Sequence, residues 1–402
     1  MLRSRERFYS DGVRVLLTES ASLTCRETLT VLGRRGVRAD VVSSGAFTIG
    51  QFSRWRRRGV HLPRVSEDPV GYVRGIGAFA GTYDAILPTH EQAWLLAAGR
   101  HLLPERFPLA VARIEAFEQV QSKLAFAQLL DSLGIAQPRW WTPDAPPADP
   151  PAQFWVKAAF STAGRGVRYA RSAGEGEALA HQLAAGGMAV MCQESAAGQY
   201  GQVQAVFDHG QLIGVHTCVL DGAGVGGSAA ARLSVGHPRA RAAVQAVGQA
   251  LDWHGGLTLD YFHTEGEPQF IECNPRTVEP GNAAAAGVDL PALMIALSRG
   301  AALPDAPVVG RAGVRTHSCL ALALGAASTG SRRRALAALI RDGGPCTSRE
   351  VLTPIHQDPV SAVPLVVTVA RAVLDPTGVD RLAAGAVDRY AVTPDVIGKL
   401  AR

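Results

Sequence analysis

The sequence predicts a mixed α/β and α+β protein, in which a doubly wound parallel-sheet domain precedes an antiparallel α+β unit and a C-terminal α/β extension. Three observations support this prediction. The chain has 402 residues, more than one hydrophobic core usually holds, so two or three packed domains are expected. Its first part alternates strand-like and helical stretches. Its middle part instead carries many short strands and few helices.

The N-terminal part contains two copies of a strand–turn–helix pattern. Residues 13–18 form an apolar run that predicts a buried strand, followed by a polar turn, a helix and a second strand at 39–43. Residues 83–89 repeat the strand and lead into a helix over 91–99. Such succession is typical of a parallel sheet whose polar turns lie at the carboxyl ends of the strands. His90 lies at one of these ends, and both ligand contact and helix capping stay open for it.

The middle and last parts have a different pattern. A helix is predicted at 121–133, a Pro-rich and Ala-rich loop at 143–151, and a hairpin turn at 208–210. From residue 311 onward an apolar strand-like run and Ala/Arg-rich helices are expected, without a recognisable chemical motif. Further strands are predicted at 154–158, 167–170, 189–194, 202–207, 212–219, 257–263 and 268–273, and further helices at 174–185, 238–252, 331–341 and 359–373.

Composition excludes several classes of protein. Hydrophobic residues make up 47% and charged residues 19% of the chain, which indicates an ordered globular protein. No apolar run reaches the roughly eighteen residues of a membrane helix, and the N-terminus lacks the pattern of a secretory signal, so a cytoplasmic protein without a membrane partner is expected. The net charge of +5 comes from dispersed residues. We interpret the clusters at 54–58 and 332–334 as solvated surface and expect no nucleic-acid partner.

Lysine is rare in this chain. Of the 40 basic residues only Lys123, Lys157 and Lys399 are lysines. A lysine kept against this bias indicates a need for a compact ammonium group, which binds phosphate as a point charge. Lys157 ends a predicted strand and is followed by the small-residue loop 161–166. Backbone N–H groups of such a loop can close over phosphate oxygens, although a flexible turn is the alternative interpretation.

Two adjacent predicted strands carry a set of oxygen ligands. Glu272 and Asn274 are two residues apart, so they lie on one face of their strand, and the neighbouring strand can bring Asp260 within reach. Three hard oxygen donors suit Mg²⁺, which completes its shell with water and nucleotide phosphates. Arg276 continues the same period and suits a phosphate oxygen. An exposed acidic edge strand would explain the carboxylates but not Asn274 and Arg276.

Together these motifs resemble the ATP-grasp superfamily, specifically its carboxylate–amine ligases. The resemblance extends from about residue 83 to residue 300, and its most specific part is the Glu-x-Asn-Pro-Arg strand ending at Arg276. It implies an N-terminal pre-ATP-grasp domain over 1–115, an ATP-grasp domain of two α+β lobes over 116–305, and a C-terminal subdomain over 306–402.

The resemblance also implies roles for individual residues. Lys157 and Arg276 would be catalytic. An acidic residue for the ribose is missing from residues 198–201, and residues 277–282 replace the glycine pair that often follows the Asn-Pro-Arg strand. The implied ATP-binding residues are Lys123 and Lys157 at the α- and β-phosphates, Ser161, Thr162, Gly164 and Gly166 in the loop over the phosphates, Gln193 and Glu194 at adenine, and Arg232 as a weaker candidate; Asp260, Glu272 and Asn274 would hold two Mg²⁺ ions.

The implied reaction uses ATP and Mg²⁺, with Mn²⁺ as an alternative metal. A substrate carboxylate becomes an acyl phosphate, an amine attacks it, and ADP and phosphate leave. The partners would be a small-molecule carboxylate and an amine, and a homodimer stays open. Alternatives are an ATP-grasp kinase or a carboxylase, although no Ala-Met-Lys-Met biotin-attachment segment is present. A non-catalytic nucleotide-binding protein is a further alternative, against which the intact ligand set argues.

Overall fold

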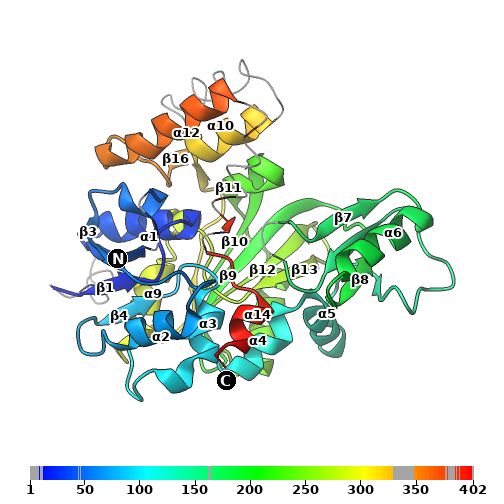
Figure 1. Cartoon of the computed structure of the whole chain (residues 1–402), viewed down its shortest axis with the longest axis horizontal. Coiled ribbons are helices and arrows are strands. Elements are labelled where there is room, and N and C mark those ends of the chain that lie inside the picture. Colours follow the sequence, from blue (N-terminus) through cyan, green and yellow to red (C-terminus); the bar gives the residue numbers. More distant parts are fainter. Residues whose placement is uncertain are drawn as a thin grey trace.

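The computed structural model describes residues 9, 12–43, 45, 47–161, 164–328, 348–375, 378, 385, 387, 388 and 390–400. Figure 1 shows an N-terminal lobe, a central sheet and a small lobe that projects to one side, with the C-terminal segment running through the middle. Within the described part of the chain, none of the helices combines the length and apolar character required to cross a bilayer.

The N-terminal lobe is built on a four-stranded parallel sheet in the order β3-β2-β1-β4. Ser22 begins the first helix, because its hydroxyl accepts a hydrogen bond from the Cys25 N–H at 3.0 Å. The predicted doubly wound parallel sheet is confirmed. Its elements are β1 (Val15–Leu17), α1 (Leu23–Gly33), β2 (Ala39–Ser43), η1 (Ile49–Gln51), β3 (Arg56–His61), α2 (Pro69–Gly77), β4 (Ala85–Leu87), α3 (Gln92–Ala98) and η2 (Arg100–Leu102).

The edge strand β3 was not predicted. Arg57 and Arg58, which the sequence assigns to solvated surface, are exposed, with side-chain exposures of 41% and 58%, and in addition form ion pairs. Arg57 Nη2 and Arg58 Nε each lie 2.7 Å from Oδ2 of Asp40, a fully buried carboxylate on β2. Buried Asp40 requires a countercharge, and the two arginines provide it. Residues 56–61 lack the alternation of apolar and polar residues that predicts a strand. The ion pairs with Asp40 instead help to hold this segment at the edge of the sheet.

The small lobe is an antiparallel sheet in the order β5-β8-β6-β7, as predicted for this part of the chain. Its core contains Trp141, Phe154 and Val156. The helix α6 covers the sheet, and two consecutive helices, α4 and α5, precede the lobe. The elements are α4 (Ile114–Gln121), α5 (Lys123–Ser132), β5 (Trp140–Trp141), β6 (Phe154–Ala158), β7 (Val167–Ala170), α6 (Ala173–Ala184) and β8 (Val190–Gln193).

The central sheet runs in the order β13-β12-β9-β10-β11-β15-β16, with β14 paired to β10. The predicted hairpin at 208–210 is present, with His209 and Gly210 at φ +43° and +75°, as a type I′ turn requires. The elements are β9 (Gln199–Asp208), β10 (Gln211–Ala223), η3 (Val225–Gly227), β11 (Ala229–Ser234), α7 (Pro238–Ala250), β12 (Gly255–His263), β13 (Gln269–Asn274), α8 (Gly281–Ala286), α9 (Leu290–Ser298), β14 (Val308–Val309), β15 (Arg315–His317) and β16 (Arg349–Glu350).

Strands from the last hundred residues therefore belong to the central sheet, so the third predicted unit shares a sheet with the second; the predicted domain boundaries stay predictions. Outside that sheet, helices α10 and α12 lie side by side (Figure 1). The predicted helix at 331–341 and the arginines at 332–334 fall outside the described residues. The remaining elements are α10 (Cys319–Ser328), η4 (Pro359–Ser361), α12 (Ala362–Leu374) and α14 (Pro394–Gly398).

The N-terminal lobe and the central sheet share their hydrophobic cores. One core joins Leu16 and Ile86 of the parallel sheet to Phe207 and Tyr261 of the central sheet. A second core includes Met294 of α9, a helix that packs against both β4 and β9. Because apolar burial continues across the boundary, the two sheets hold a fixed relation to each other.

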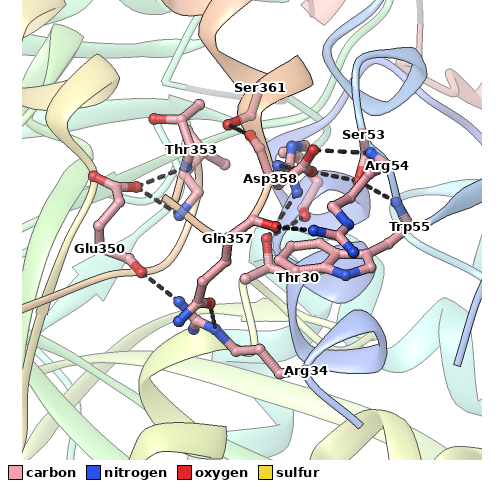
Figure 2. A network of polar contacts seen from close by, with 12 residues as sticks. Thr30, Arg34, Ser53, Arg54, Trp55, Glu350, Thr353, Gln357, Asp358 and Ser361 are labelled. Carbon is pink, nitrogen blue, oxygen red and sulfur yellow. Dashed lines mark hydrogen bonds and ion pairs between the residues drawn. The ribbon is translucent and has the colours of Figure 1, made fainter. Parts of the chain in front are cut away.

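A buried ion pair fastens the C-terminal part to the N-terminal lobe (Figure 2). Arg26 Nη2 of α1 lies 2.8 Å from Asp358 Oδ2, and both side chains have 0% exposure. The same carboxylate accepts hydrogen bonds from the Ser53 hydroxyl at 2.6 Å and the Arg54 N–H at 2.8 Å. Full satisfaction of the Asp358 oxygens makes this burial tolerable.

We predict that Asp358→Ala lowers the free energy of unfolding by about 3–5 kcal/mol, because it leaves the Arg26 charge buried without a partner. Urea unfolding followed by circular dichroism measures the change. Asp305→Ala, at an exposed position, is the matched control and should stay within about 0.5 kcal/mol of wild type. Equal losses in the two variants would contradict the assignment of Asp358 as an anchor.

Candidate functional site

The predicted metal ligands lie together on β12 and β13. Asp260 pairs directly with Glu272, and Thr258 pairs with Asn274, in the antiparallel register of these strands. The Asn274 Nδ2 group donates to Asp260 Oδ2 at 3.3 Å. The strand pairing thus places two carboxylates and one amide on one face of the sheet. Their role as metal ligands stays a prediction.

The Asp260 carboxylate is buried and electrostatically strained. Burial, and then the charge of Glu272, raise the pKa of Asp260, while hydrogen bonds from Tyr200 and Gln202 and the charge of Arg276 lower it. The Gln202 amide donates to Asp260 Oδ1 at 3.0 Å. Tyr200 and Gln202, two residues apart on β9, are site residues that sequence reasoning missed; the period-two spacing on a strand beside β12 was the available signal.

The two rare lysines both point into this region. Lys123 begins α5, and its Nζ lies 2.8 Å from Glu272 Oε1 and 3.2 Å from both the carbonyl oxygen and the hydroxyl of Ser161. Lys157, near the end of β6, donates to Gln193 Oε1 at 2.5 Å. The pKa of Lys157 is lowered to about 8, chiefly by burial; the Glu272 charge opposes this change and the Lys123 charge adds to it. The ammonium groups therefore lie where the small lobe faces β13.

The loop between β6 and β7 requires its small residues. Gly164 has φ +71°, a conformation that side chains disfavour. A Cβ on Gly166 would lie 2.6 Å from Ser161 Cβ and 2.9 Å from Ala158 Cβ. The Ala158 N–H donates to the Gly166 carbonyl at 2.7 Å, which closes the loop at its base. Thr162, also predicted as a loop residue, lies outside the described residues.

The predicted adenine hinge follows β8. The Gln193 side chain is buried between the Lys157 ammonium and the Pro138 carbonyl, which accepts from its amide at 3.5 Å. The Glu194 carboxylate instead turns to Arg139, 2.7 Å from Nε, and the Glu194 N–H donates to the Arg139 carbonyl. The Glu194 N–H and one oxygen of its carboxylate are therefore already engaged, and the role of residues 193 and 194 at adenine stays a prediction.

The two predicted arginines have different surroundings. Arg276 Nη2 lies 3.3 Å from His90 Nε2, and burial, followed by the Arg276 charge, lowers the pKa of His90, so neutral His90 accepts that hydrogen bond. Arg232 Nη2 is paired with Glu279 Oε2 at 2.5 Å. Glu279 lies in the segment that replaces the glycine pair, with φ +38°. Arg276 therefore belongs to the centre of the site, and Arg232 is already engaged.

The C-terminal segment contributes to the site, which no sequence signal indicated. The rings of Tyr390 and His90 lie 4.1 Å apart, and the Tyr390 carbonyl accepts from the Gln92 amide at 3.3 Å. Asp388 forms an ion pair with Arg165 of the β6–β7 loop at 2.5 Å. Three hundred residues of intervening chain separate Tyr390 from His90, and only the tertiary fold brings them together.

Several solved structures resemble this chain. Biotin carboxylase from Campylobacter jejuni, solved as a β-γ-ATP complex, has a TM-score of 0.56 and 19% identity over 73% of this chain and 72% of its own. N5-carboxyaminoimidazole ribonucleotide synthetase from Thermus thermophilus has a TM-score of 0.54 and 15% identity, covering 75% and 81%. L-amino acid ligase from Bacillus licheniformis has 0.53 and 13%, covering 72% and 75%.

No family model matches the chain, and a search of curated proteins finds no match either. At these identities the structural likeness shows the fold alone, and the fold is the one that the sequence motifs led us to expect.

We predict that one lysine titrates near pH 8 in the unliganded protein, because burial destabilises the charged form of Lys157. ¹³C reductive methylation labels the three lysines and the α-amino group, which itself titrates near pH 8, and the resulting NMR spectrum is simple enough to follow each signal against pH. Comparison of Lys157→Arg with wild type assigns the Lys157 signal as the one that is lost. A midpoint for that lost signal near the ordinary lysine value of about 10.4 would refute the prediction.

Proposed function

We propose that this chain, which has the ATP-grasp fold, is an ATP-dependent carboxylate–amine ligase. In the proposed reaction a carboxylate oxygen attacks the γ-phosphorus, the bond to the β,γ-bridging oxygen breaks, and ADP leaves. The amine nitrogen then attacks the acyl carbon, loses a proton, and inorganic phosphate leaves. The products are an amide, ADP and phosphate, and no covalent enzyme intermediate is required.

One observation carries this proposal. The ammonium groups of Lys123 and Lys157 lie in the same site as the paired carboxylates of Asp260 and Glu272. Cations for a polyphosphate and oxygen ligands for a divalent metal are thereby a few ångströms apart. The donor set fits Mg²⁺, since two carboxylates face each other beside the Asn274 amide, whose oxygen can serve as a third ligand, and Mn²⁺ accepts the same ligands. Bound by Asp260, Glu272 and Asn274, the metal would neutralise phosphate charge.

The residues of the chain have separable tasks in this proposal. Lys123 would exchange its contacts with Ser161 and Glu272 for a phosphate oxygen, and Lys157 would do so from Gln193. The loop over 161–166 would then cover the phosphates with backbone N–H groups. Arg276, held beside neutral His90, would orient the carboxylate or the transferring phosphoryl group through its guanidinium fork.

Exclusion of water is necessary because an acyl phosphate hydrolyses readily. The Arg165–Asp388 ion pair links the loop to the C-terminal segment, and the Tyr390 ring covers His90. Near the loop the Trp94 and Phe160 rings stack at 5.8 Å. We propose that this cover keeps water from the carboxylate until the amine is bound. The substrates would be small molecules, and homodimerisation stays a prediction.

We predict that Glu272→Gln lowers kcat/KM about 100-fold or more, because it removes a metal ligand and the partner of Lys123. The assay measures ADP and phosphate release from Mg-ATP with amino acids, other carboxylates and bicarbonate, singly and with amines. Release that needs an acid and an amine together supports the ligase; release with an acid alone, yielding a stable phosphorylated product, would indicate a kinase instead.

The matched control is Glu265→Gln, at an exposed position in the turn of the same hairpin. It should keep wild-type turnover. ATP binding without turnover on any pair, equal in wild type and Glu272→Gln, would contradict both the metal assignment and the ligase.

We further predict that Gly166→Ala raises the KM for ATP on the order of tenfold to a hundredfold, because its Cβ forces Ser161 away from Lys123. Steady-state kinetics at saturating second substrate give the value. Gly174→Ala, in α6 with open space around the new Cβ, should leave this KM unchanged and keep or raise the melting temperature. An unchanged KM in Gly166→Ala would exclude the loop from nucleotide binding.

A further inference from the structure

A second cationic site lies away from the proposed ATP site. A cavity of about 250 Å³ opens where α1, α8 and β16 meet. We call it the four-arginine cavity, because four guanidinium-bearing residues and no carboxylate line it. Its lining comprises Arg34, Arg35, Arg311 and Arg349, with Val31, Gly281, Ala284 and Ala285.

Little negative charge offsets these arginines. Arg35 Nε lies 3.0 Å from Asp289 Oδ2. Arg34 instead donates to neutral groups, the Gln357 amide oxygen at 2.8 Å and the Glu350 main-chain carbonyl at 2.9 Å (Figure 2). Arg311 also bonds only carbonyl oxygens, of residues 285 and 286. Among the described residues, Asp289 is thus the one carboxylate in an ion pair with these arginines, while the charges of Glu350 and Glu27 act on Arg34 without such a contact.

Nearby Glu350 offsets the charge of Arg34 only in part, because its carboxylate forms no ion pair with the arginines of the cavity. Its side chain accepts hydrogen bonds from the N–H groups of Cys319, Leu352 and Thr353. These contacts use both carboxylate oxygens. The hydrogen bonds of the Glu350 carboxylate therefore go to the backbone around β16, and its effect on Arg34 is that of a nearby charge alone.

Arg349 stands out among the four. Within the described part of the chain its guanidinium has no hydrogen-bond or ion-pair partner, although its backbone pairs in the sheet. Burial, followed by the charge of Arg35, lowers the pKa of Arg349, and burial, followed by the charge of Arg349, lowers that of Arg34 to about 10. The like charges are close enough to repel, which costs stability unless an anion lies between them.

We propose that the four-arginine cavity binds a small phosphoryl anion, either inorganic phosphate or the phosphate of a small phosphomonoester. Guanidinium groups match phosphate oxygens in pairs, and several of them around one cavity favour a dianion over chloride. The volume accommodates a phosphate with a few additional atoms but no drug-sized ligand. This proposal does not depend on the proposed ligase activity.

The position of the cavity gives binding a structural consequence. Arg34 and Arg35 directly follow α1 of the N-terminal lobe, the small residues belong to α8, and Arg349 belongs to β16. The N-terminus of α8 is joined to α1 by the Gly281 N–H, which donates to Glu27 Oε2 at 2.8 Å. A bound dianion would therefore connect three parts of the fold and raise the stability of the whole chain.

The test is isothermal titration of the full chain, without nucleotide, with inorganic phosphate at fixed ionic strength, accompanied by the melting temperature. We expect saturable one-to-one binding and a higher melting temperature. Arg349→Ala, which loses no contact with the described residues, should weaken phosphate binding about tenfold or more while keeping the melting temperature of the unliganded protein. Lys123→Gln should leave this phosphate affinity unchanged.

Two controls separate a built site from general screening. Arg171→Ala, at an exposed position on the small lobe, removes the same charge and should bind phosphate as wild type does. Chloride at equal ionic strength should not reproduce the stabilisation. Equal affinity in Arg349→Ala and wild type, or loss of binding in Lys123→Gln alone, would overturn the proposal, as would equal stabilisation by chloride.

A second titration with glycerol 3-phosphate identifies the source of the phosphoryl group. Binding of the ester at the same stoichiometry, weakened by Arg349→Ala, would assign the cavity to a phosphorylated metabolite. Binding of inorganic phosphate alone would assign it to the free anion. Binding of neither ion would contradict the proposal.

Discussion

The Lys123–Glu272 ion pair is the interaction on which the arrangement of the site depends. It joins the first residue of α5, the strand β13 and, through Ser161, the loop that follows β6. These three elements belong to different parts of the chain, and the Lys123 N–H, which donates to the Ala159 carbonyl at 2.9 Å, supports the same arrangement. Because Lys123 is almost fully buried, separation of the pair would leave an ammonium group with little solvent, which makes the contact a strong geometric constraint.

Burial of charge is the general strategy of this protein. Arg26 with Asp358, Arg232 with Glu279, and Asp40 with two arginines all place carboxylates inside and satisfy them with guanidinium groups. Such pairs add little to net stability compared with apolar packing. An alternative arrangement that separates them would leave a buried charge without a partner and would therefore be strongly destabilised. They explain why a chain so rich in arginine is not simply a cationic surface.

The C-terminal segment has two attachments that suit a covering element. Its start is anchored through Asp358, and its end returns to the site, where Tyr390 lies on His90 and the Val392 N–H donates to Glu91 at 2.6 Å. The contact between Asp388 and Arg165 is by contrast exposed, and exposed ion pairs are weak. The buried anchors of this segment therefore lie on the N-terminal lobe, and its ion pair with the β6–β7 loop is exposed.

The sequence by itself determined the local elements and the ligand strands. Short-range periodicity placed β2, β6 and β7 at their observed bounds, and the two-residue spacing of Glu272 and Asn274 put them on one face. The same periodicity could not predict β3, whose arginines pair with Asp40 on the neighbouring strand. It also could not predict that Tyr200 and Gln202 are hydrogen-bond partners of Asp260. Tertiary structure alone decided the contacts of Tyr390 and the gathering of four arginines, because sequence spacing carries no information about residues hundreds of positions apart.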